Sequence, residues 1–352
     1  SGDAAIVHNG EVYNSPELRR DLLGAGLSLR GHSDTEAILE GLERAGERHL
    51  DRLNGIFAFA WHHQPTGRTL IARDPFGVKP LYFHASPRRL LFASEIRAIL
   101  LDASLRRELD PDELRALLTL RYSPAPGTLL KGVRKLLPGH FLRVQEDRVE
   151  TLRFDAWVPP PETEASFDAC VADYDTALER AVRGQLLSDV PVGTFLSGGL
   201  DSSVVAQIAG AGAGIGPAFT VGFRDEGASR IDADERADAA WTARHLGIEH
   251  ESVIVGPEDF AGALPRVIAA IEEPVGRASA VPYWFLAGHA ARHLKVVLTG
   301  QGADEPHGGY PRYQGVLLAS RLGHRLPPGV GAFLSRAVPG RRERLRRGLG
   351  IL

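Results

Sequence analysis

The stretch that decides the fold is Val190-Pro191-Val192-Gly193-Thr194-Phe195-Leu196, followed by Ser197-Gly198-Gly199-Leu200-Asp201-Ser202-Ser203. The first part is a mostly apolar run of strand length, and helical spacing begins at Ser202. Between them, two glycines let backbone N–H groups approach a ligand closely. Hydroxyl groups lie at the start of a helix, where the partial positive charge favours an anion. The stretch therefore predicts a strand, a ligand-binding loop and a helix.

Strand-like and helix-like runs alternate around this unit. Ser166 is expected to cap an amphipathic helix that begins at Phe167. Further strands are expected at 218–223, 251–255 and 295–299, and helices at 234–246, 258–271 and 282–293. Such alternation implies right-handed βαβ units and a parallel sheet with helices on both faces. Because ligands bind beyond the carboxyl ends of such strands, the loop at 197–203 should share one edge with those at 222–226 and 300–305.

The aspartate in the first loop suggests a metal ion. A phosphate alone would be repelled by Asp201, but a carboxylate is useful there if it holds Mg²⁺ that bridges phosphate oxygens. Asp304, on the last loop, is a natural second ligand. Neither a Walker loop nor the Gly-x-Gly-x-x-Gly spacing of a dinucleotide fold is present. The alternative is a solvated Gly/Ser turn with a capping aspartate.

The first half of the chain has a different pattern. It ends at Val158-Pro159-Pro160-Pro161-Glu162-Thr163-Glu164, where three prolines remove backbone donors and fix φ. We therefore place one domain at 1–157, a linker at 158–166 and a second domain at 167–352. The first should be an α+β domain with a helix over 33–53 and an antiparallel meander. Its strands are expected at 56–61, 69–72, 81–84 and 90–93.

Composition excludes several classes of protein. The 352 residues carry 41 Lys and Arg against 44 Asp and Glu, and a net charge of −3 gives no electrostatic case for a nucleic-acid partner. One cysteine cannot form an intrachain disulfide, and no apolar run reaches the ~18 residues of a membrane helix. A cytoplasmic protein with no membrane partner is therefore expected. Because the chain lacks methionine and begins at Ser1, we expect it not to be a whole translation product.

The loop and several other segments resemble a known family. Ser-Gly-Gly-Leu-Asp-Ser-Ser at 197–203 resembles the signature of the ATP pyrophosphatases (PP-loop enzymes), which cleave ATP between its α and β phosphates. Ordered N-terminal segments, including Arg73-Asp74-Pro75-Phe76-Gly77, resemble the class II glutamine amidotransferase domain of glutamine-hydrolysing asparagine synthetases. The matching segments are 7–14, 32–36, 53–60, 72–82, 92–96, 188–193 and 308–313.

The resemblance implies both the fold and what the chain lacks. It implies part of an N-terminal nucleophile (Ntn) hydrolase-type amidotransferase domain, followed by a parallel-sheet PP-loop ATP pyrophosphatase domain without its C-terminal part. The family's nucleophile is an N-terminal cysteine, and an early arginine binds the glutamine carboxylate; neither is in this sequence. Cys170 is interpreted as a small buried hydrophobe. The chain alone is therefore not expected to hydrolyse glutamine.

The resemblance assigns a glutamine site to four residues. Asn9 and Gly10 would form the oxyanion hole, a pair of donors aimed at the charge that develops on the amide carbonyl. Glu11 and Asp34 would bind the α-amino group of glutamine. The alternative for Asn9-Gly10 is a hairpin turn, and the alternative for Asp34 is a helix N-cap.

The resemblance also assigns a synthetase site. Asp201 and Asp304 would hold Mg²⁺. The residues assigned to ATP or the departing pyrophosphate are Leu196, Ser197, Gly198, Gly199, Asp201, Ser202, Val221, Thr299 and Gly300. Gln301 departs from the family, which usually has an acidic residue where the acyl-adenylate forms. A neutral amide keeps hydrogen bonding but loses the charge, which puts the acceptor in doubt.

The resulting expectation is an ATP-dependent ligase that hydrolyses L-glutamine and transfers the ammonia to an acyl-AMP. By resemblance the acceptor is L-aspartate, the products are asparagine, glutamate, AMP and pyrophosphate, and a homodimer is plausible. A different carboxylic acid of secondary metabolism is the alternative that Gln301 suggests. A non-catalytic relative is a second alternative, and another PP-loop ligase, such as an NAD or GMP synthetase, is disfavoured by the amidotransferase type.

Overall fold

The computed structural model describes residues 2–146, 148–155, 164–211, 214–224, 234–276 and 278–323. Contacts along the chain define two compact units. Unit 1 contains 1–190, 221–234 and 252–295, and unit 2 contains 191–220, 235–251 and 296–352. The three prolines of the predicted linker and part of the predicted loop at 222–226 lie outside the described residues.

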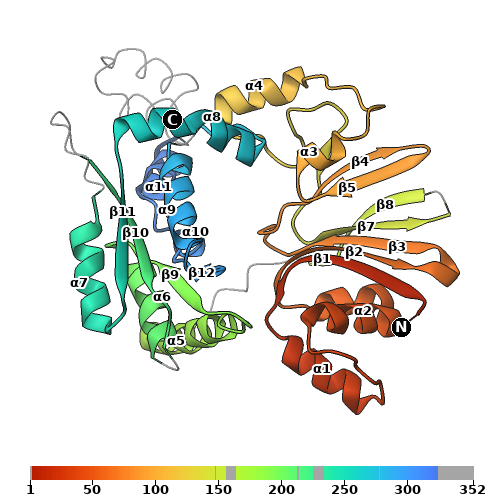
Figure 1. Cartoon of the computed structure of the whole chain (residues 1–352), viewed down its shortest axis with the longest axis horizontal. Helices are drawn as coiled ribbons and strands as arrows, with labels where there is room; N and C mark the ends of the chain where they lie inside the picture. Colours follow the sequence, from red (N-terminus) through yellow and green to blue (C-terminus); the bar gives the residue numbers. More distant parts are fainter. Residues whose placement is uncertain are drawn as a thin grey trace. The chain divides into compact units, whose positions relative to one another are not determined.

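The N-terminal part of unit 1 contains an antiparallel five-stranded sheet in the order β1-β2-β3-β7-β8 (Figure 1). Its strands are β1 (Ala4–Val12), β2 (Gly55–His63), β3 (Arg68–Arg73), β7 (His140–Gln145) and β8 (Arg148–Arg153). A second sheet has the order β5-β4-β6, with β4 (Tyr82–Ser86), β5 (Arg89–Ala93) and β6 (Arg134–Lys135). The expected meander is wrong, because β2–β3 and β4–β5 are hairpins of two different sheets.

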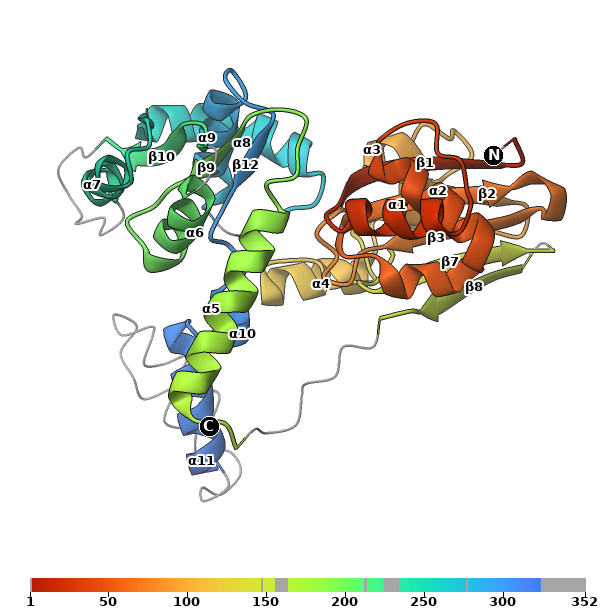
Figure 2. The same cartoon turned by 90° about the horizontal axis from the view of Figure 1, so that it is seen from below.

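The alternation of β2 explains the layers. Phe57, Phe59 and Trp61 are buried toward helices α1 (Ser15–Gly24) and α2 (Asp34–Ala45). The small residues Ala58 and Ala60 point to the opposite face and pack in one cluster with Phe83 of the second sheet and with Leu81 and Leu136, which flank its strands. Figures 1 and 2 show the two helices on one face of the five-stranded sheet. This helix–sheet–sheet arrangement confirms the α+β prediction.

The helix expected over 33–53 is wrong at its C-terminal end. Ser33 caps α2, and its hydroxyl accepts a hydrogen bond from the N–H of Glu36. The α-helix ends at Ala45, because Gly46 has a φ of 59°, and a 3₁₀ helix, η1 (Gly46–Arg52), follows. The remaining elements of this part are η2 (Gln64–Thr66), α3 (Ile96–Ile99) and α4 (Pro111–Leu120).

The C-terminal half has the predicted parallel sheet, in the order β11-β10-β9-β12. Its strands are β9 (Val192–Phe195), β10 (Ala218–Phe223), β11 (His250–Val255) and β12 (Val296–Leu298). Both β10 and β12 pair parallel with β9. The helices are α5 (Phe167–Gly184), α6 (Leu200–Gly210), α7 (Arg236–Leu246), α8 (Pro257–Ile271), α9 (Ala280–Ala290), α10 (Asp304–His307) and α11 (Pro311–Gly323). Ser166 caps α5 as expected.

Small side chains let α6 and α7 pack closely. Ala206 of α6 and Ala239 and Ala243 of α7 form a buried cluster with Leu196 and Ala218. This cluster fixes the loop after β9 relative to the N-terminal ends of both helices. Among the described residues, none of the helices has the length and apolar character needed to cross a membrane.

Candidate functional site

The predicted oxyanion pair lies inside a strand. Asn9 and Gly10 belong to β1 and face Ala58 and Phe57 of β2, so the hairpin-turn alternative is wrong. Gly10 has a φ of +153°, and a Cβ there would lie 2.1 Å from the carbonyl oxygen of Ile56. Only glycine allows this close approach of two backbones.

Asn9 is held at a pocket of unit 1. Its side-chain Nδ2 donates a hydrogen bond to the hydroxyl of Ser94 at 3.1 Å. Asn9 and Ser94 line a pocket of about 310 Å³ together with residues of β1, β2 and β5. An amide N–H₂ at the wall of a pocket can donate to an oxyanion when it is held in place. Ser94 belongs to a segment that the resemblance included but gave no role.

The acidic residues of the predicted glutamine site lie together. Asp34 is the first residue of α2 rather than its N-cap, and its Oδ2 accepts a hydrogen bond from the N–H of Val12 at 3.0 Å. The N-cap alternative for Asp34 is therefore wrong. Burial raises the pKa of Glu11, and the charges of Asp34 and Asp189 raise it further. Acidic side chains placed in this way favour binding of a cation such as an α-ammonium group.

His8 extends this group, and sequence reasoning missed it. Its side chain is 4% exposed, and its Nδ1 lies 3.1 Å from Thr35 Oγ1 and 3.8 Å from Asp34 Oδ2. Burial lowers the pKa of His8, although the nearby Asp34 opposes this. Nε2 is buried and has no hydrogen-bond partner among the described residues. Its position in an apolar strand gave no signal, because the contact with α2 is formed only on folding.

The quoted segment at 73–77 has a structural role. Asp74 is fully buried, and its carboxylate accepts hydrogen bonds from the N–H groups of Phe57, Phe76, Val78 and Lys79 at 2.9–3.3 Å. The N–H groups of Phe76, Val78 and Lys79, in the turn after β3, have no backbone acceptors among the described residues, and the Asp74 carboxylate accepts their hydrogen bonds instead. The segment therefore shapes the scaffold between the two sheets.

The second candidate site lies in unit 2, where a short loop connects β9 and α6. Ser202 is buried, and its hydroxyl lies 2.8 Å from that of Ser197 and accepts a hydrogen bond from the Ser197 N–H at 3.1 Å. The N–H of Gly199 donates to Ser197 Oγ at 3.1 Å. Within the described part of the chain, no hydrogen bond is made by the N–H groups of Leu200 and Asp201. They lie in the first turn of α6, where an anion is favoured.

Through Gly300, the loop after β12 contacts the first turn of α6, which directly follows the loop after β9. A Cβ on Gly300 would lie 2.6 Å from the backbone nitrogen of Ser202 and 2.9 Å from the carbonyl carbon of Asp201. Asp304 follows as the first residue of α10, and a Cβ on Gly309 would lie 2.1 Å from its Oδ1. The structure thus places Gly300 of the last loop against the backbone of the first, as the parallel sheet predicts.

The other predicted residues lie within β10 or just after β9 and β12. Leu196 is buried, and its carbonyl accepts a hydrogen bond from Thr220 Oγ1 at 2.6 Å. Val221 is a half-buried residue of β10. Thr299 Oγ1 accepts a hydrogen bond from the N–H of Gln301 at 3.3 Å, and Gln301 is exposed.

Two acidic residues, one at the N-cap of α7 and one in its first turn, reach the loop after β9, and the sequence did not indicate this. The N–H of Gly198 donates to Glu235 Oε2 at 3.2 Å. A Cβ on Gly198 would lie 2.9 Å from Cβ of Asp238, which leaves no room for a side chain. Gly198 and Asp238 also line a pocket of about 490 Å³ with Trp241 and other residues of α6 and α7. The Glu235 carboxylate therefore accepts, in this structure, the Gly198 N–H that could otherwise donate to a bound anion.

The donor set of this loop fits a hard metal ion and a polyphosphate. Asp201 is exposed, and its carboxylate has no hydrogen bond or ion pair among the described residues. Asp201 in the first turn of α6 and Asp304 at the start of α10 each offer carboxylate oxygens, the ligands that Mg²⁺ prefers, and Ser197 and Ser202 offer hydroxyl groups. This chemistry is compatible with magnesium and the phosphates of ATP.

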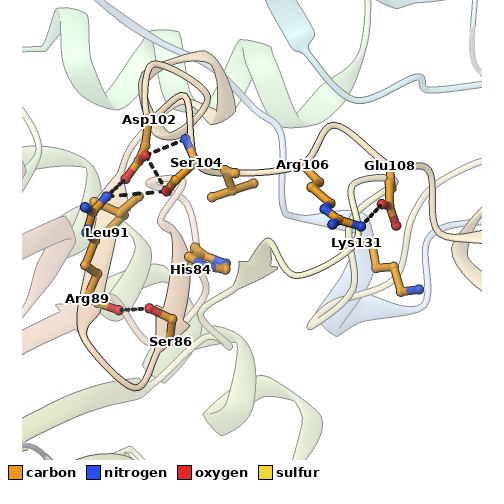
Figure 3. A pocket seen from close by; sticks show the side chains of 10 residues that line it. His84, Ser86, Arg89, Leu91, Asp102, Ser104, Arg106, Glu108 and Lys131 are labelled. Atoms are coloured by element: carbon orange, nitrogen blue, oxygen red, sulfur yellow. Dashed lines mark hydrogen bonds and ion pairs between the residues drawn. The ribbon is translucent and has the colours of Figure 1, made fainter.

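A third pocket lies beside β4 and β5 and contains none of the predicted residues (Figure 3). Its volume is about 210 Å³, and His84, Arg89 and Asp102 are among its lining residues. Arg89 forms an ion pair with Asp102 at 2.8 Å. Hydrogen bonds from Ser104 and from Arg89 hold the pKa of Asp102 at about 2. The pocket is thus lined by charges that largely neutralise each other.

The fold and the two sites define a two-part protein: an amidotransferase-type α+β sandwich, and a parallel sheet with a Ser-Gly-Gly loop at its ligand edge. The family model for "Asparagine synthase" matches residues 173–350, and the model for "Glutamine amidotransferase domain" matches residues 1–155. The chain therefore belongs to the asparagine synthase family.

Curated relatives are similar over most of the chain. "Asparagine synthetase [glutamine-hydrolyzing] 1" of Bacillus subtilis (strain 168) is 35% identical over 331 residues, which are 94% of this chain and 51% of that protein. A "Putative asparagine synthetase [glutamine-hydrolyzing]" of Mycobacterium bovis is 38% identical over 319 residues, 88% of this chain and 48% of that protein. "Amidase chyE" of Penicillium rubens is 31% identical over 333 residues, 89% and 48% of the two chains. The chain spans about half the length of the relatives it matches.

Proposed function

We propose that the chain provides both half-sites of an ATP-dependent, glutamine-hydrolysing amide synthetase. The site on β1 would bind L-glutamine and stabilise the oxyanion formed when its amide is cleaved. The site at the ligand edge of the parallel sheet would bind ATP and an acceptor carboxylate. Adenylation is needed because a carboxylate is a poor electrophile, and ammonia would then attack the acyl-AMP and release AMP.

The observation that carries the proposal is the contact between the two loops of unit 2. Gly300 lies against the backbone of Asp201 and Ser202, so the segment after β12, which leads to Asp304, and the segment after β9, which leads to Asp201, belong to one edge of the sheet. The hydroxyls of Ser197 and Ser202, together with the N-terminus of α6, would hold the departing pyrophosphate. Asp201 and Asp304 would hold Mg²⁺, which would neutralise phosphate charge. Cleavage between the α and β phosphates releases a highly charged pyrophosphate, and these groups would stabilise its negative charge.

The glutamine half of the proposal is supported by the residues around Asn9. Asn9 Nδ2 and the N–H of Gly10 would donate to the oxyanion, and Glu11 and Asp34 would bind the α-ammonium group. The acidic group is already partly desolvated, which strengthens its attraction for a cation. The four residues of this half-site include no nucleophile and no group for the glutamine carboxylate, so they account for binding and for oxyanion stabilisation only.

L-Aspartate is the default acceptor, and Gln301 is the reason to test others. Gln301 is exposed beside Thr299, and its neutral amide cannot attract an ammonium group as a carboxylate does. A carboxylic acid of secondary metabolism is therefore the second candidate. The similarity of the chain to a fungal protein named as an amidase fits this second candidate. We expect the reaction to take place in the cytoplasm.

The test is a product analysis with the protein expressed from the complete gene. It is incubated with ATP, Mg²⁺ and glutamine, and screened against aspartate and other carboxylic acids. We expect AMP, pyrophosphate and one amide, and D201N should lower pyrophosphate release about 100-fold. D175N is the matched control, because Asp175 is an exposed residue of α5. Formation of ADP would refute the mechanism, and release of pyrophosphate with another acid but not aspartate would refute the asparagine assignment.

Two further outcomes separate the remaining alternatives. Absence of pyrophosphate release with every acceptor, in a protein that is folded and binds ATP, would favour a non-catalytic relative. Release with a nucleoside-type acceptor would favour an NAD or GMP synthetase. The molar mass of the same protein in solution tests whether it is a homodimer.

A further inference from the structure

Glu272 connects the end of α8 to the turn that follows β5. Its Oε2 accepts a hydrogen bond from the N–H of Ile96 at 2.5 Å, and its Oε1 accepts one from the N–H of Arg97 at 3.0 Å. Its side chain is 10% exposed and also lies 2.9 Å from Arg97 Nε. All of these residues belong to unit 1. Glu272 thus binds both free donors at the start of α3.

Helix α3 has no cap from its own segment. Its N-cap residue is Glu95, whose side chain makes no capping hydrogen bond and is 56% exposed. The first N–H groups of a helix need an acceptor when they are shielded from water. For α3 the acceptor comes from residue 272, which is about 175 residues further along the chain.

The backbone of Glu272 indicates that its side chain is needed. Glu272 is the C-cap of α8 and has a φ of +63°, a conformation that favours glycine. A glutamate in this conformation is strained, yet its side chain is only 10% exposed and each of its carboxylate oxygens accepts a backbone hydrogen bond. A position that only ended α8 would be better filled by glycine.

The same turn holds the proposed oxyanion donor. Ser94, two residues before Ile96, accepts the hydrogen bond of Asn9 Nδ2 at 3.1 Å. Ser94 and Asn9 line one pocket. Glu272 is therefore connected to Asn9 in three steps: it caps α3, a short turn joins α3 to Ser94, and Ser94 accepts the hydrogen bond of Asn9.

We propose that Glu272 is a positioning residue for the glutamine site, acting through α3 and Ser94 on Asn9. It lies in the segment matched by the asparagine synthase model and acts on the segment matched by the amidotransferase model. The inference rests on the proposed glutaminase function. It means that the amidotransferase centre reaches its active geometry only with a residue from the other family segment.

The test compares E272G, E272Q and E95Q in the protein expressed from the complete gene. E272G removes both acceptors from α3, so it should lower kcat for glutamine hydrolysis about 10-fold and change KM less than twofold. Because glycine favours a positive φ, this variant should not destabilise the end of α8. E272Q keeps one carbonyl oxygen as acceptor and should lose about threefold. E95Q, which neutralises an exposed carboxylate in the same turn, should match the wild type. Pyrophosphate release driven by added ammonia should be unchanged in all three.

Several results would overturn the inference. One is a wild-type kcat in E272G, another is a change in KM alone, and a third is an equal loss of the ammonia-driven reaction, which would indicate general damage. Hydrogen exchange measures the same path without activity: the N–H of Ile96 and the side-chain amide of Asn9 should both exchange faster in E272G. If the wild type does not hydrolyse glutamine, the proposed function fails, and the exchange rates still decide whether Glu272 positions Asn9.

Discussion

Substitution of Gly300 by alanine tests how closely the two loops of unit 2 must approach. The new Cβ would lie 2.6 Å from the nitrogen of Ser202 and 2.9 Å from the carbonyl carbon of Asp201. Heavy atoms in contact need about 3.5 Å, and both neighbours are backbone atoms that cannot rotate away, so the loops must separate by about 1 Å. We expect a loss of about 1–3 kcal/mol of stability from overpacking. A 1 Å displacement of reacting groups should lower ATP-dependent pyrophosphate release about 100-fold.

The assay measures pyrophosphate release with ATP, Mg²⁺ and ammonia, together with the melting temperature. G262A is the matched control, because a Cβ on Gly262 in α8 would meet nothing within 4 Å. This control should keep its rate and gain up to about 1 kcal/mol of stability. If G300A releases pyrophosphate at the wild-type rate, the contact between the loops does not position the site, and the reasoning is refuted.

Three further predictions concern unit 1. Burial lowers the pKa of His49 to about 4 from 6.5, so the unfolded chain binds a proton more readily between these values. The free energy of unfolding should therefore fall by about 3 kcal/mol as the pH decreases from 6.5 to 4, and H49Q should lose this dependence in denaturant titrations. Because its pKa is raised, Glu11 should lose its charge at a higher pH than an ordinary glutamate does. The KM for glutamine should therefore begin to increase at that higher pH as the solution is acidified. A pH profile of E11Q without this increase checks the cause. D74N should cost about 3 kcal/mol in thermal unfolding, since an amide cannot accept four N–H groups.

The elements of the parallel sheet could be predicted because each strand is a short apolar run between helical patterns. The bounds predicted for β10 agree with Ala218–Phe223. The first half was harder. Hydrophobic spacing continues past Ala45, but the positive φ of Gly46 ends the α-helix there. The sequence also showed four short strands without showing that they divide between two sheets, because pairing of β3 with β7 depends on residues some 70 positions away.

The residues of the candidate sites also fall into those that the sequence indicates and those that only the structure shows. Residues within the motifs, such as Asn9 and Ser202, could be proposed from the sequence because the motif itself singles them out. Glu235, Glu272 and His8 could not be proposed. In the sequence each is an unremarked polar residue, and its role comes from a contact with a distant element that forms only on folding.

Glycine explains why the motifs could be recognised at all. At Gly10 a side chain would meet the carbonyl oxygen of Ile56 at 2.1 Å, and at Gly300 it would meet the nitrogen of Ser202 at 2.6 Å. Both contacts join two backbones, so no change of rotamer elsewhere relieves them, and the requirement for glycine is absolute at that geometry. A carboxylate such as that of Glu272 can be replaced by other side chains without loss of the fold, and only the position of the groups that it holds would change. The sequence therefore indicates where backbones must meet, whereas the polar side chains that adjust these meeting points are seen only in the structure.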